Sequence, residues 1–476
     1  MRIAVIGGGA VGALVARELA RYESTTILFE REPDVGWGVT KANSAIVHGG
    51  FHDRPGTVRS RFCVSGNAMF EPLCAELGVP FLRTGAYVLA FDDHEASVLE
   101  TLRAWGNENG ATDLEIHSRE QILDREPQVN PHVQAALWSP SVAITEPWGL
   151  AMAAVENAVE NGVDVHLAEE ITGIETEAGR VCAVLTNRDR YPVDAVVNAA
   201  GLFADRIAAM VGLPEPHLHP RRGEYILLDK NSAGLVNSVL FPTPNEDTKG
   251  ILVLPTIDGG ILLGPTAVNQ PEDARGEAVT TSEGIHEVIE GSRRLVPEVN
   301  LSLVVKTFAG LRPESSQEDF VVGKSIVEGF YQAAAMRSPG LTAAPAIAQW
   351  LVRDLMKPDL SLKPSRSFRP SRAMIPRMAE LSLEERDRHI RKDPRLGRTV
   401  CYCNEVSEGE VVDAIRRGAR TLDGVKFRTR ASFGRCQGAS CSGSILRILA
   451  RELQVEPEEI VQRRSESWIL SEKART

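Results

Sequence analysis

The 476-residue sequence lacks long apolar runs and any excess of positive charge. A bilayer-spanning helix needs about 18–20 consecutive apolar residues, and no run in the chain reaches that length. Acidic side chains outnumber basic ones by 64 to 53, which argues against nucleic-acid binding as the main task. The N-terminus also lacks the charged start and cleavage site of a signal peptide. We expect a cytoplasmic protein with no transmembrane segment and no nucleic-acid partner.

Cysteine is scarce, and most of it is concentrated near the C-terminus. Of seven cysteines, four form two tight pairs: Cys401, Cys403, Cys436 and Cys441. In a reducing compartment, paired cysteines are metal ligands more often than disulfides. Four thiolates suit either zinc or an iron–sulfur cluster. The spacing is CxC, a gap of 32 residues and CxxxxC, whereas zinc sites more often show CxxC.

The N-terminal stretch RIAVIGGGAVGALVAREL has the pattern of a strand, a glycine turn and a helix. Gly7, Gly9 and Gly12 match GxGxxG, and a second apolar strand, TTILFE, ends at Glu30. In this arrangement the glycines admit a pyrophosphate at the helix N-terminus, and the acid accepts hydrogen bonds from a ribose. The sequence therefore predicts a dinucleotide-binding fold.

A late apolar strand, at Ala195 to Val197 in DAVVNAAGLFADRIA, ends in small residues before a helix. Such a strand, returning to the nucleotide fold after a long insertion, is typical of two-domain flavoproteins. Over roughly residues 1–355 the chain resembles the glycine oxidase and D-amino-acid oxidase superfamily of FAD enzymes. That resemblance implies bound FAD with the substrate placed over the flavin.

Several stretches of the middle of the chain sharpen this resemblance. They are TKANSAIVHGGFHD (40–53), RRGEY (221–225), TKGILVLPTIDGGILLGPTA (248–267), FAGLRPESS (308–316) and MRSPGLTAAPAIAQWL (336–351). Their order and spacing are similar to those of the soluble glycerol-3-phosphate oxidases and dehydrogenases, and less closely to the L-2-hydroxyglutarate oxidases. Residues 248–267 also have the pattern of two strands joined by an Asp-Gly-Gly turn.

The resemblance implies roles for individual residues. The implied catalytic residues are His48 and Arg312, and the implied substrate contacts are Ser44, Lys249, Arg312 and Ser338. The implied cofactor-binding residues are Gly7, Gly9, Gly12, Glu30, Arg31, Thr40, Asn43, Ser44, Ala200, Gly201, Arg312, Gly340, Leu341 and Thr342. The segment 340–342 also opens a helix, so its N–H groups suit an anionic flavin.

General chemistry is consistent with these roles but leaves alternatives. A histidine suits the base that takes a hydroxyl proton, and arginine with lysine suits an anionic substrate. His48 could instead be a structural histidine, Arg312 could bond a backbone carbonyl, and Lys249 could be a solvated turn residue. Arg221 and Arg222 are alternative anion contacts.

His52 and Asp53 adjoin His48 in the sequence, and we assign them no role.

Residues 357–399 have the composition of a connector. Prolines recur, and 12 Lys and Arg stand against 6 Asp and Glu, which we interpret as a solvated basic face. The stretch LSLEERDRHI predicts a short helix. Beyond the connector, SEGEVVDAIRRG predicts a helix capped by Ser407 and stopped at Gly418.

The cysteine pattern C-x-C-N…G-x-C-Q-G-x-x-C resembles the small domain of bacterioferritin-associated ferredoxin. The same domain forms the tail of the large subunit of anaerobic glycerol-3-phosphate dehydrogenase. This resemblance implies a 2Fe–2S cluster, with zinc as the lesser alternative. Because such a cluster carries single electrons, it also implies an electron-acceptor protein subunit, through which the chain could associate peripherally with a membrane.

The expected fold class is α/β, with a Rossmann-like FAD-binding domain interleaved with an antiparallel-sheet substrate domain. A small C-terminal helical domain, in which four cysteines hold a metal cluster, is expected to follow. The expected oxidoreductase unit is 1–356, with FAD-binding parts at 1–80, 145–215 and 310–356 and substrate-domain parts at 81–144 and 216–309. A linker at 357–399 and a 2Fe–2S domain at 400–476 complete the chain.

The leading functional hypothesis is an FAD-dependent dehydrogenase that oxidises sn-glycerol 3-phosphate to dihydroxyacetone phosphate. Two alternatives are dehydrogenases of the same type that act on another substrate: a 2-hydroxy acid such as L-2-hydroxyglutarate, or a secondary amine or amino acid such as proline, hydroxyproline or glycine. A third alternative is a non-catalytic electron-transfer subunit.

Overall fold

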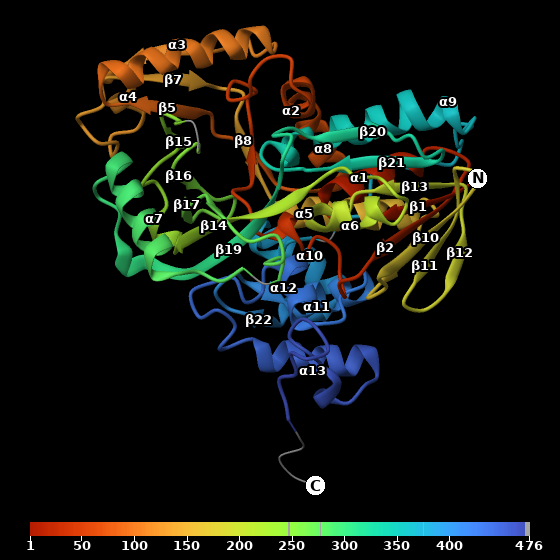
Figure 1. Cartoon of the computed structure of the whole chain (residues 1–476). Coiled ribbons are helices and arrows are strands. Elements are labelled where there is room, and N and C mark those ends of the chain that lie inside the picture. The colour runs from red at the N-terminus through yellow and green to blue at the C-terminus, as the bar shows by residue number, and fades with distance from the viewer. Residues whose placement is uncertain (246–247, 277, 375, 472–476) are drawn as a thin grey trace.

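The computed structural model describes residues 1–245, 248–276, 278–374 and 376–471. The end of the predicted 400–476 domain, residues 472–476, lies outside the described residues. Figure 1 shows a nucleotide-binding part, a second part built on a large sheet, and a C-terminal domain (blue) beneath both. Among the described residues, no helix is long and apolar enough to cross a membrane.

The nucleotide-binding part is built on a six-stranded sheet of order β20-β21-β13-β1-β2-β9. Its strands are β1 (Arg2–Ile6), β2 (Thr25–Glu30), β9 (Asp164–Leu167), β13 (Ala195–Asn198), β20 (Val321–Lys324) and β21 (Phe330–Ala334). All neighbours are parallel except β20, which is antiparallel to β21. The predicted strands at both ends of the nucleotide fold are therefore confirmed, and their carboxyl ends meet at one edge.

Helices and a small sheet cover the two faces of this sheet. The helices are α1 (Ala10–Leu19), α2 (Val58–Leu77), α5 (Pro147–Glu160), α6 (Ala204–Ala209) and α8 (Gly340–Trp350), which continues into a π-helical turn (Leu351–Met356). Side chains of α1, α5 and α8 form one buried apolar core with β1 and β13. A three-stranded sheet, β10 (Ile171–Glu177), β11 (Arg180–Thr186) and β12 (Arg190–Pro192), packs on the opposite face.

The second part is a nine-stranded sheet of order β18-β14-β17-β16-β15-β5-β7-β6, with β19 also paired to β14. Its strands are β5 (Ala86–Ala90), β6 (Glu115–Ser118), β7 (Ala135–Ser139), β14 (Leu218–Leu228), β15 (Val239–Pro242), β16 (Leu252–Pro255), β17 (Ile261–Gly264), β18 (Val268–Asn269) and β19 (Val304–Ser315). The predicted hairpin is confirmed as β16 and β17. The sheet is antiparallel except where β15 runs parallel to β5, because a long insertion separates these strands in sequence.

Helices α3 (Asp93–Glu108), α4 (Arg119–Arg125) and α7 (Ser282–Leu295) pack on this sheet. A small sheet of β3 (Ile46–Val47), β8 (Ala143–Thr145) and β4 (Phe81–Arg83) lies in the order β3-β8-β4.

The connector contains α9 (Lys357–Asp359) and the predicted short helix, α10 (Leu383–Lys392), which begins with a Ser382–Glu385 capping box. The expectation of a solvated basic face is wrong for Arg372 and Arg377. Both side chains are largely buried, and they pair with the buried carboxylates of Glu156 and Glu146 on and before α5. These arginines attach the connector to the nucleotide-binding part.

The C-terminal domain comprises β22 (Thr399–Cys401), β23 (Val406–Ser407), α11 (Glu408–Arg416), α12 (Leu422–Thr429) and α13 (Ser442–Leu453) around its own apolar core. The predicted cap is confirmed, because Ser407 and Glu410 form a capping box at the start of α11. Helix α12 contacts α5, which places the domain against the nucleotide-binding part.

Candidate active site

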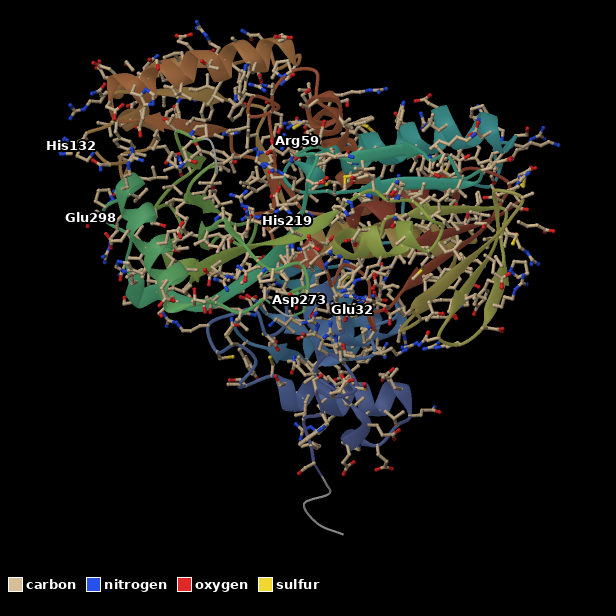
Figure 2. All side chains as sticks on the ribbon, in the orientation of Figure 1. Glu32, Arg59, His132, His219, Asp273 and Glu298 are labelled. Carbon is tan, nitrogen blue, oxygen red and sulfur yellow. The ribbon has the colours of Figure 1, made fainter. Side chains whose placement is uncertain are left out.

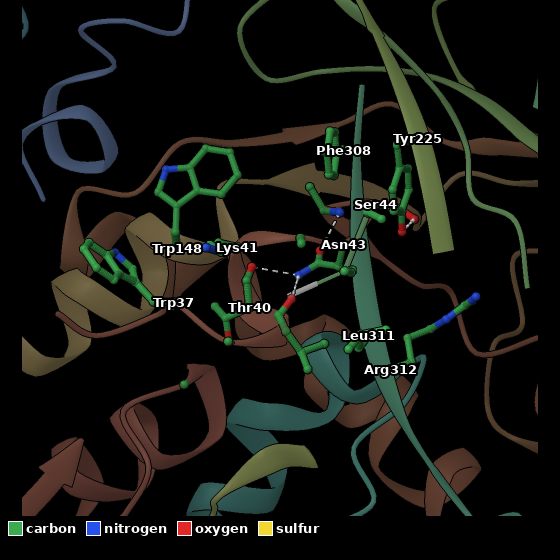
Figure 3. A pocket seen from close by; sticks show the side chains of 18 of the residues that line it. Trp37, Thr40, Lys41, Asn43, Ser44, Trp148, Tyr225, Phe308, Leu311 and Arg312 are labelled. Carbon is green, nitrogen blue, oxygen red and sulfur yellow. Dashed lines mark hydrogen bonds between the residues drawn. The ribbon is translucent and has the colours of Figure 1, made fainter. Parts of the chain in front are cut away.

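A cavity of about 1910 Å³ connects all three parts of the molecule. Its lining includes the glycine turn after β1, the face of the nine-stranded sheet and residues of the C-terminal domain, among them Cys403. Figure 3 shows Trp37, Trp148 and Lys41 on one side, and Tyr225, Ser44 and Arg312 on the other. The cavity therefore joins the predicted nucleotide site, the predicted substrate residues and one of the four paired cysteines, Cys403.

The glycine turn fits a bound dinucleotide. Gly7 has a positive φ of 104°, and a Cβ there would lie 2.5 Å from the Ala199 carbonyl oxygen. A Cβ on Gly12 would lie 1.9 Å from the Gly7 carbonyl oxygen, so only glycine allows helix α1 to approach the strands this closely. Gly9 lines the cavity beside the start of α1, and the N-terminus of a helix suits a pyrophosphate.

Glu30, at the end of β2, also lines the cavity. Its carboxylate accepts hydrogen bonds from the N–H groups of Gly8 (2.8 Å) and Glu32 (2.9 Å). Burial raises the pKa of Glu30 to about 7, against which these two hydrogen bonds act. The neighbouring guanidinium of Arg31 stacks 3.7 Å from the centre of the Phe203 ring. The Glu30 carboxylate thus lies where it could accept hydrogen bonds from the hydroxyls of a ribose.

The loop that contains Thr40, Asn43 and Ser44 is held by its own side chains. The Thr40 hydroxyl accepts a hydrogen bond from the N–H of Ala10 at the start of α1 (3.0 Å). The Asn43 amide donates to the Thr40 carbonyl (2.9 Å) and accepts from the N–H of Ala45 (2.7 Å). Asn43 therefore shapes the cavity wall through the backbone that it fixes.

The substrate sheet touches this loop at Gly310 on β19. A Cβ at Gly310 would lie 2.2 Å from the carbonyl oxygen of Ala42. Arg312 follows two residues later on the same strand, and Ser44 follows two residues after Ala42. The sheet and the loop thus meet backbone to backbone between the predicted cofactor and substrate residues.

His48 lies at the wall of the cavity, just after β3. Its Nε2 is 3.1 Å from the Ser338 hydroxyl, and its backbone N–H donates a hydrogen bond to the Thr342 hydroxyl (2.9 Å). Its Nδ1 is buried without a hydrogen-bond partner in the described part of the chain. Burial, and secondarily the charge of Lys249, hold the pKa of His48 well below its ordinary value. A purely structural role would therefore explain the hydrogen bond of Nε2, but it would leave Nδ1 without a partner among the described residues.

The two predicted cations both lie in the cavity. The ammonium of Lys249 is buried and has no hydrogen-bond partner among the described residues, so the solvated-turn alternative is excluded. Arg312 donates from Nη2 to the Thr266 carbonyl oxygen (2.6 Å), as the carbonyl alternative supposed. Its Nε nevertheless has no partner in that same set, and burial lowers the pKa of both side chains. Buried donors of this kind suit an anionic ligand.

Most of the other predicted residues line the cavity, and one lies behind its lining. Ala200, Gly201, Gly340, Leu341 and Ser338 line it, whereas Thr342 is fully buried behind it and holds the backbone of His48. Of the two alternative anion contacts, Arg221 lines the cavity, and Arg222 lies 3.7 Å from the Glu224 carboxylate.

Two residues without a predicted role join the site. The Tyr225 hydroxyl is 3.3 Å from the Ser44 hydroxyl, and its ring stacks on Phe308 with centroids 4.8 Å apart. Both ring nitrogens of His52 are buried without partners among the described residues, and the ring centre is 6.1 Å from that of His48. Tyr225 ends the RRGEY stretch, so its place in that motif was the available signal. Nothing in the sequence distinguished His52.

The four paired cysteines come together as two thiol pairs. Cys403 and Cys436 have sulfurs 3.8 Å apart, and Cys441 lies beside Cys401. Among the described residues, no three potential ligands converge on one metal position. A single zinc would need its four sulfurs at about 2.3 Å from one centre. Four thiolates arranged as two pairs suit a binuclear iron–sulfur cluster, with two thiolates for each iron.

Comparisons with known proteins agree with this geometry. Residues 2–353 match the model of the FAD dependent oxidoreductase family, and residues 399–451 match the BFD-like [2Fe-2S] binding domain. A glycerol 3-phosphate dehydrogenase of Caloramator mitchellensis is 42% identical over 474 residues, which cover 98% of both chains.

Two matches are proteins of Mycoplasma pneumoniae. A glycerol 3-phosphate oxidase is 29% identical over 74% of this chain and 93% of its own. The solved structure of a dithionite-reduced L-alpha-glycerophosphate oxidase with FAD bound superposes with a TM-score of 0.73. That match is 28% identical and covers 79% of this chain and 98% of the oxidase. The chain belongs to the FAD-dependent oxidoreductase family, in the branch of the glycerol-3-phosphate dehydrogenases and oxidases.

Proposed function

We propose that the protein oxidises sn-glycerol 3-phosphate to dihydroxyacetone phosphate and exports the electrons through a 2Fe–2S cluster in its C-terminal domain. The observation that carries the proposal is the pair of buried cations, Lys249 and Arg312, which line the cavity together with His48 and have no carboxylate partner among the described residues. The names of the relatives support the choice of substrate.

Arg312 and Lys249 would hold the phosphate. A guanidinium grips two phosphate oxygens at once, and an ammonium adds a point charge. Arg312 is already fixed by the Thr266 carbonyl through one nitrogen, which leaves Nε for the ligand. An amine substrate has no need of two cations, so this pair favours the phosphate over the amino-acid alternatives.

His48 would take the hydroxyl proton. Because burial and Lys249 depress its pKa, the imidazole is neutral at physiological pH and able to accept a proton. Ser338, at 3.1 Å from Nε2, orients the ring towards the cavity. Bound FAD would supply the hydride acceptor, and Gly7, Gly9 and Glu30, which line the cavity, are the residues that would hold it.

The path towards the tail is aromatic. Trp148 stacks on Phe433 with centroids 5.5 Å apart, and Phe433 lines the cavity together with Cys403. A cluster on the four thiolates would accept one electron at a time and pass it to an acceptor subunit. A cytoplasmic location, with any membrane contact made through that subunit, completes the proposal.

The test is an anaerobic titration of the purified protein with sn-glycerol 3-phosphate, followed by visible absorption. The proposal expects loss of the flavin band and then bleaching of a broader iron–sulfur band. An oxidised flavin that ignores glycerol 3-phosphate but bleaches with L-2-hydroxyglutarate or proline contradicts the substrate. Flavin bands without iron–sulfur absorption, with zinc in the metal analysis, contradict the export route.

A further inference from the structure

A stretch near the end of the C-terminal domain lines the cavity beside the predicted nucleotide site. Residues 462–466 line it together with Glu30 and Arg31, the residues at the end of β2. We propose that this stretch is part of the FAD-binding site, where it covers the adenosine half of the cofactor and retains it in the protein.

The first contact is an ion pair beside the ribose carboxylate. Arg464 donates two hydrogen bonds to Glu32, from Nη2 to Oε1 (2.6 Å) and from Nε to Oε2 (2.9 Å). Glu32 in turn donates its N–H to Glu30. Figure 2 shows Glu32 at the border with the blue C-terminal domain. The tail is thus bonded two residues from the group that would bind the ribose.

The second contact is made on Trp37. The guanidinium of Arg463 lies 5.4 Å from the centre of the Trp37 ring. Trp37 is 2% exposed and lines the cavity, and its indole N–H is buried with no hydrogen-bond partner in the described part of the chain. A buried donor without a partner at a cavity wall points to a ligand that is held there.

The third contact fixes the loop between these points. Arg428 on α12 binds the Asp34 carboxylate through both terminal nitrogens, one of them at 2.9 Å. Asp34 also accepts the N–H of Val35 within its own loop. The loop 32–37 follows the ribose carboxylate directly, and the C-terminal domain holds it at Glu32, Asp34 and Trp37. On this proposal, FAD leaves past this loop only when the tail contacts open.

The proposal predicts the rate at which the holoenzyme loses FAD. Arg464→Glu places two carboxylates together at the closing contact, and the matched control Arg447→Glu makes the same reversal on the exposed face of α13. After dilution into a scavenger of free flavin, recovery of FAD fluorescence should be about tenfold faster in Arg464→Glu than in the native protein. Arg447→Glu should match the native rate.

Equal rates for all three proteins would overturn the proposal. Iron content and far-UV circular dichroism establish that the tail is intact in each. If Arg464→Glu does not fold, Arg464→Gln removes the ion pair without repulsion and should give a smaller acceleration in the same assay.

A second readout follows from linkage, since tail contacts that retain FAD must in turn be stabilised by FAD. Amide hydrogen exchange in residues 462–466 should slow when FAD is added to the apoprotein, while exchange on the outer face of α13 stays unchanged. Identical exchange in 462–466 with and without FAD would contradict the proposal without bearing on the substrate.

Discussion

The two ends of the cavity treat buried cations in opposite ways. At the substrate end, Lys249 and Arg312 are buried without a carboxylate within ion-pair distance among the described residues. At the tail end, Arg428 and Arg430 are as well buried, but each is bonded to carboxylates of the nucleotide-binding part, such as Asp34 and Glu146. Unpaired cations mark a place prepared for an anion, and paired ones fasten two parts of the same chain.

The energetic reason is the cost of burying charge. An ion that leaves water needs a partner of opposite sign, and the penalty remains where the partner is absent from the fold. The substrate end therefore carries a cost that a phosphate would relieve on binding. At the tail end, carboxylate partners offset this cost for Arg428 and Arg430, so these two arginines should matter for stability and leave the chemistry unchanged.

The largest effect is expected at His48, which belongs to the substrate end but carries no charge. His48→Gln removes the proposed base and should slow reduction of bound FAD by glycerol 3-phosphate by about 10²- to 10⁴-fold. Stopped-flow absorption under anaerobic conditions measures the rate. A variant with normal FAD content and a native rate would exclude His48 as the base.

The next largest effect is expected at Arg312, where activity and stability should move in different directions. Arg312→Leu should cost about 2–5 kcal/mol of substrate binding, or about 30- to 5,000-fold in kcat/KM. Because it also removes an unpaired buried charge, the melting temperature should stay the same or rise. Kinetics and differential scanning calorimetry on one preparation test both halves. A clear fall in melting temperature would show that Arg312 is structural.

Arg428 should give the reverse pattern. Arg428→Met leaves Asp34 buried without its partner, which should destabilise docking of the tail by about 3–5 kcal/mol. Urea unfolding measures the loss, with Arg447→Met as the exposed control on the same domain. In FAD-loaded protein, reduction of the flavin by substrate should keep its native rate. A slowed flavin reduction would mean that the two ends are not separable.

The smallest effect is a shift in pH dependence at Lys249. The charge of Lys249 helps to depress the pKa of His48, so Lys249→Met should raise that pKa towards its ordinary value. The base then becomes protonated at a higher pH, so the acid limb of the kcat/KM profile should shift to higher pH. Lys249→Arg keeps the charge and should keep the native limb. An unmoved limb in Lys249→Met would place the base elsewhere.

Local patterns predicted much of this molecule. The glycine turn, the strand that ends at Glu30, the β16–β17 hairpin and the capped helix α11 each depend on residues close in sequence. The docking of the tail depends on pairs such as Arg430 with Glu146, which are 284 residues apart. No periodicity or spacing in one sequence connects such positions.

The same limit explains the errors and omissions. Arg372 and Arg377 looked like solvated charges because their acidic partners lie on and before α5, far back in the chain. His52 gave no signal, because its isolation from hydrogen-bond partners among the described residues is a property of the packed site.

The contact at Gly310 bears on which substrates related enzymes can come to accept. Arg312 and Ser44 each lie two residues from the point where β19 and the loop touch, or about 7 Å along an extended chain. This close contact leaves no room for a side chain at residue 310, so we expect the separation between Arg312 and Ser44 to be set by the fold. A change of substrate specificity would then require exchange of side chains while this separation stays the same. Substrates with a longer distance between the anionic group and the oxidised carbon would be disfavoured.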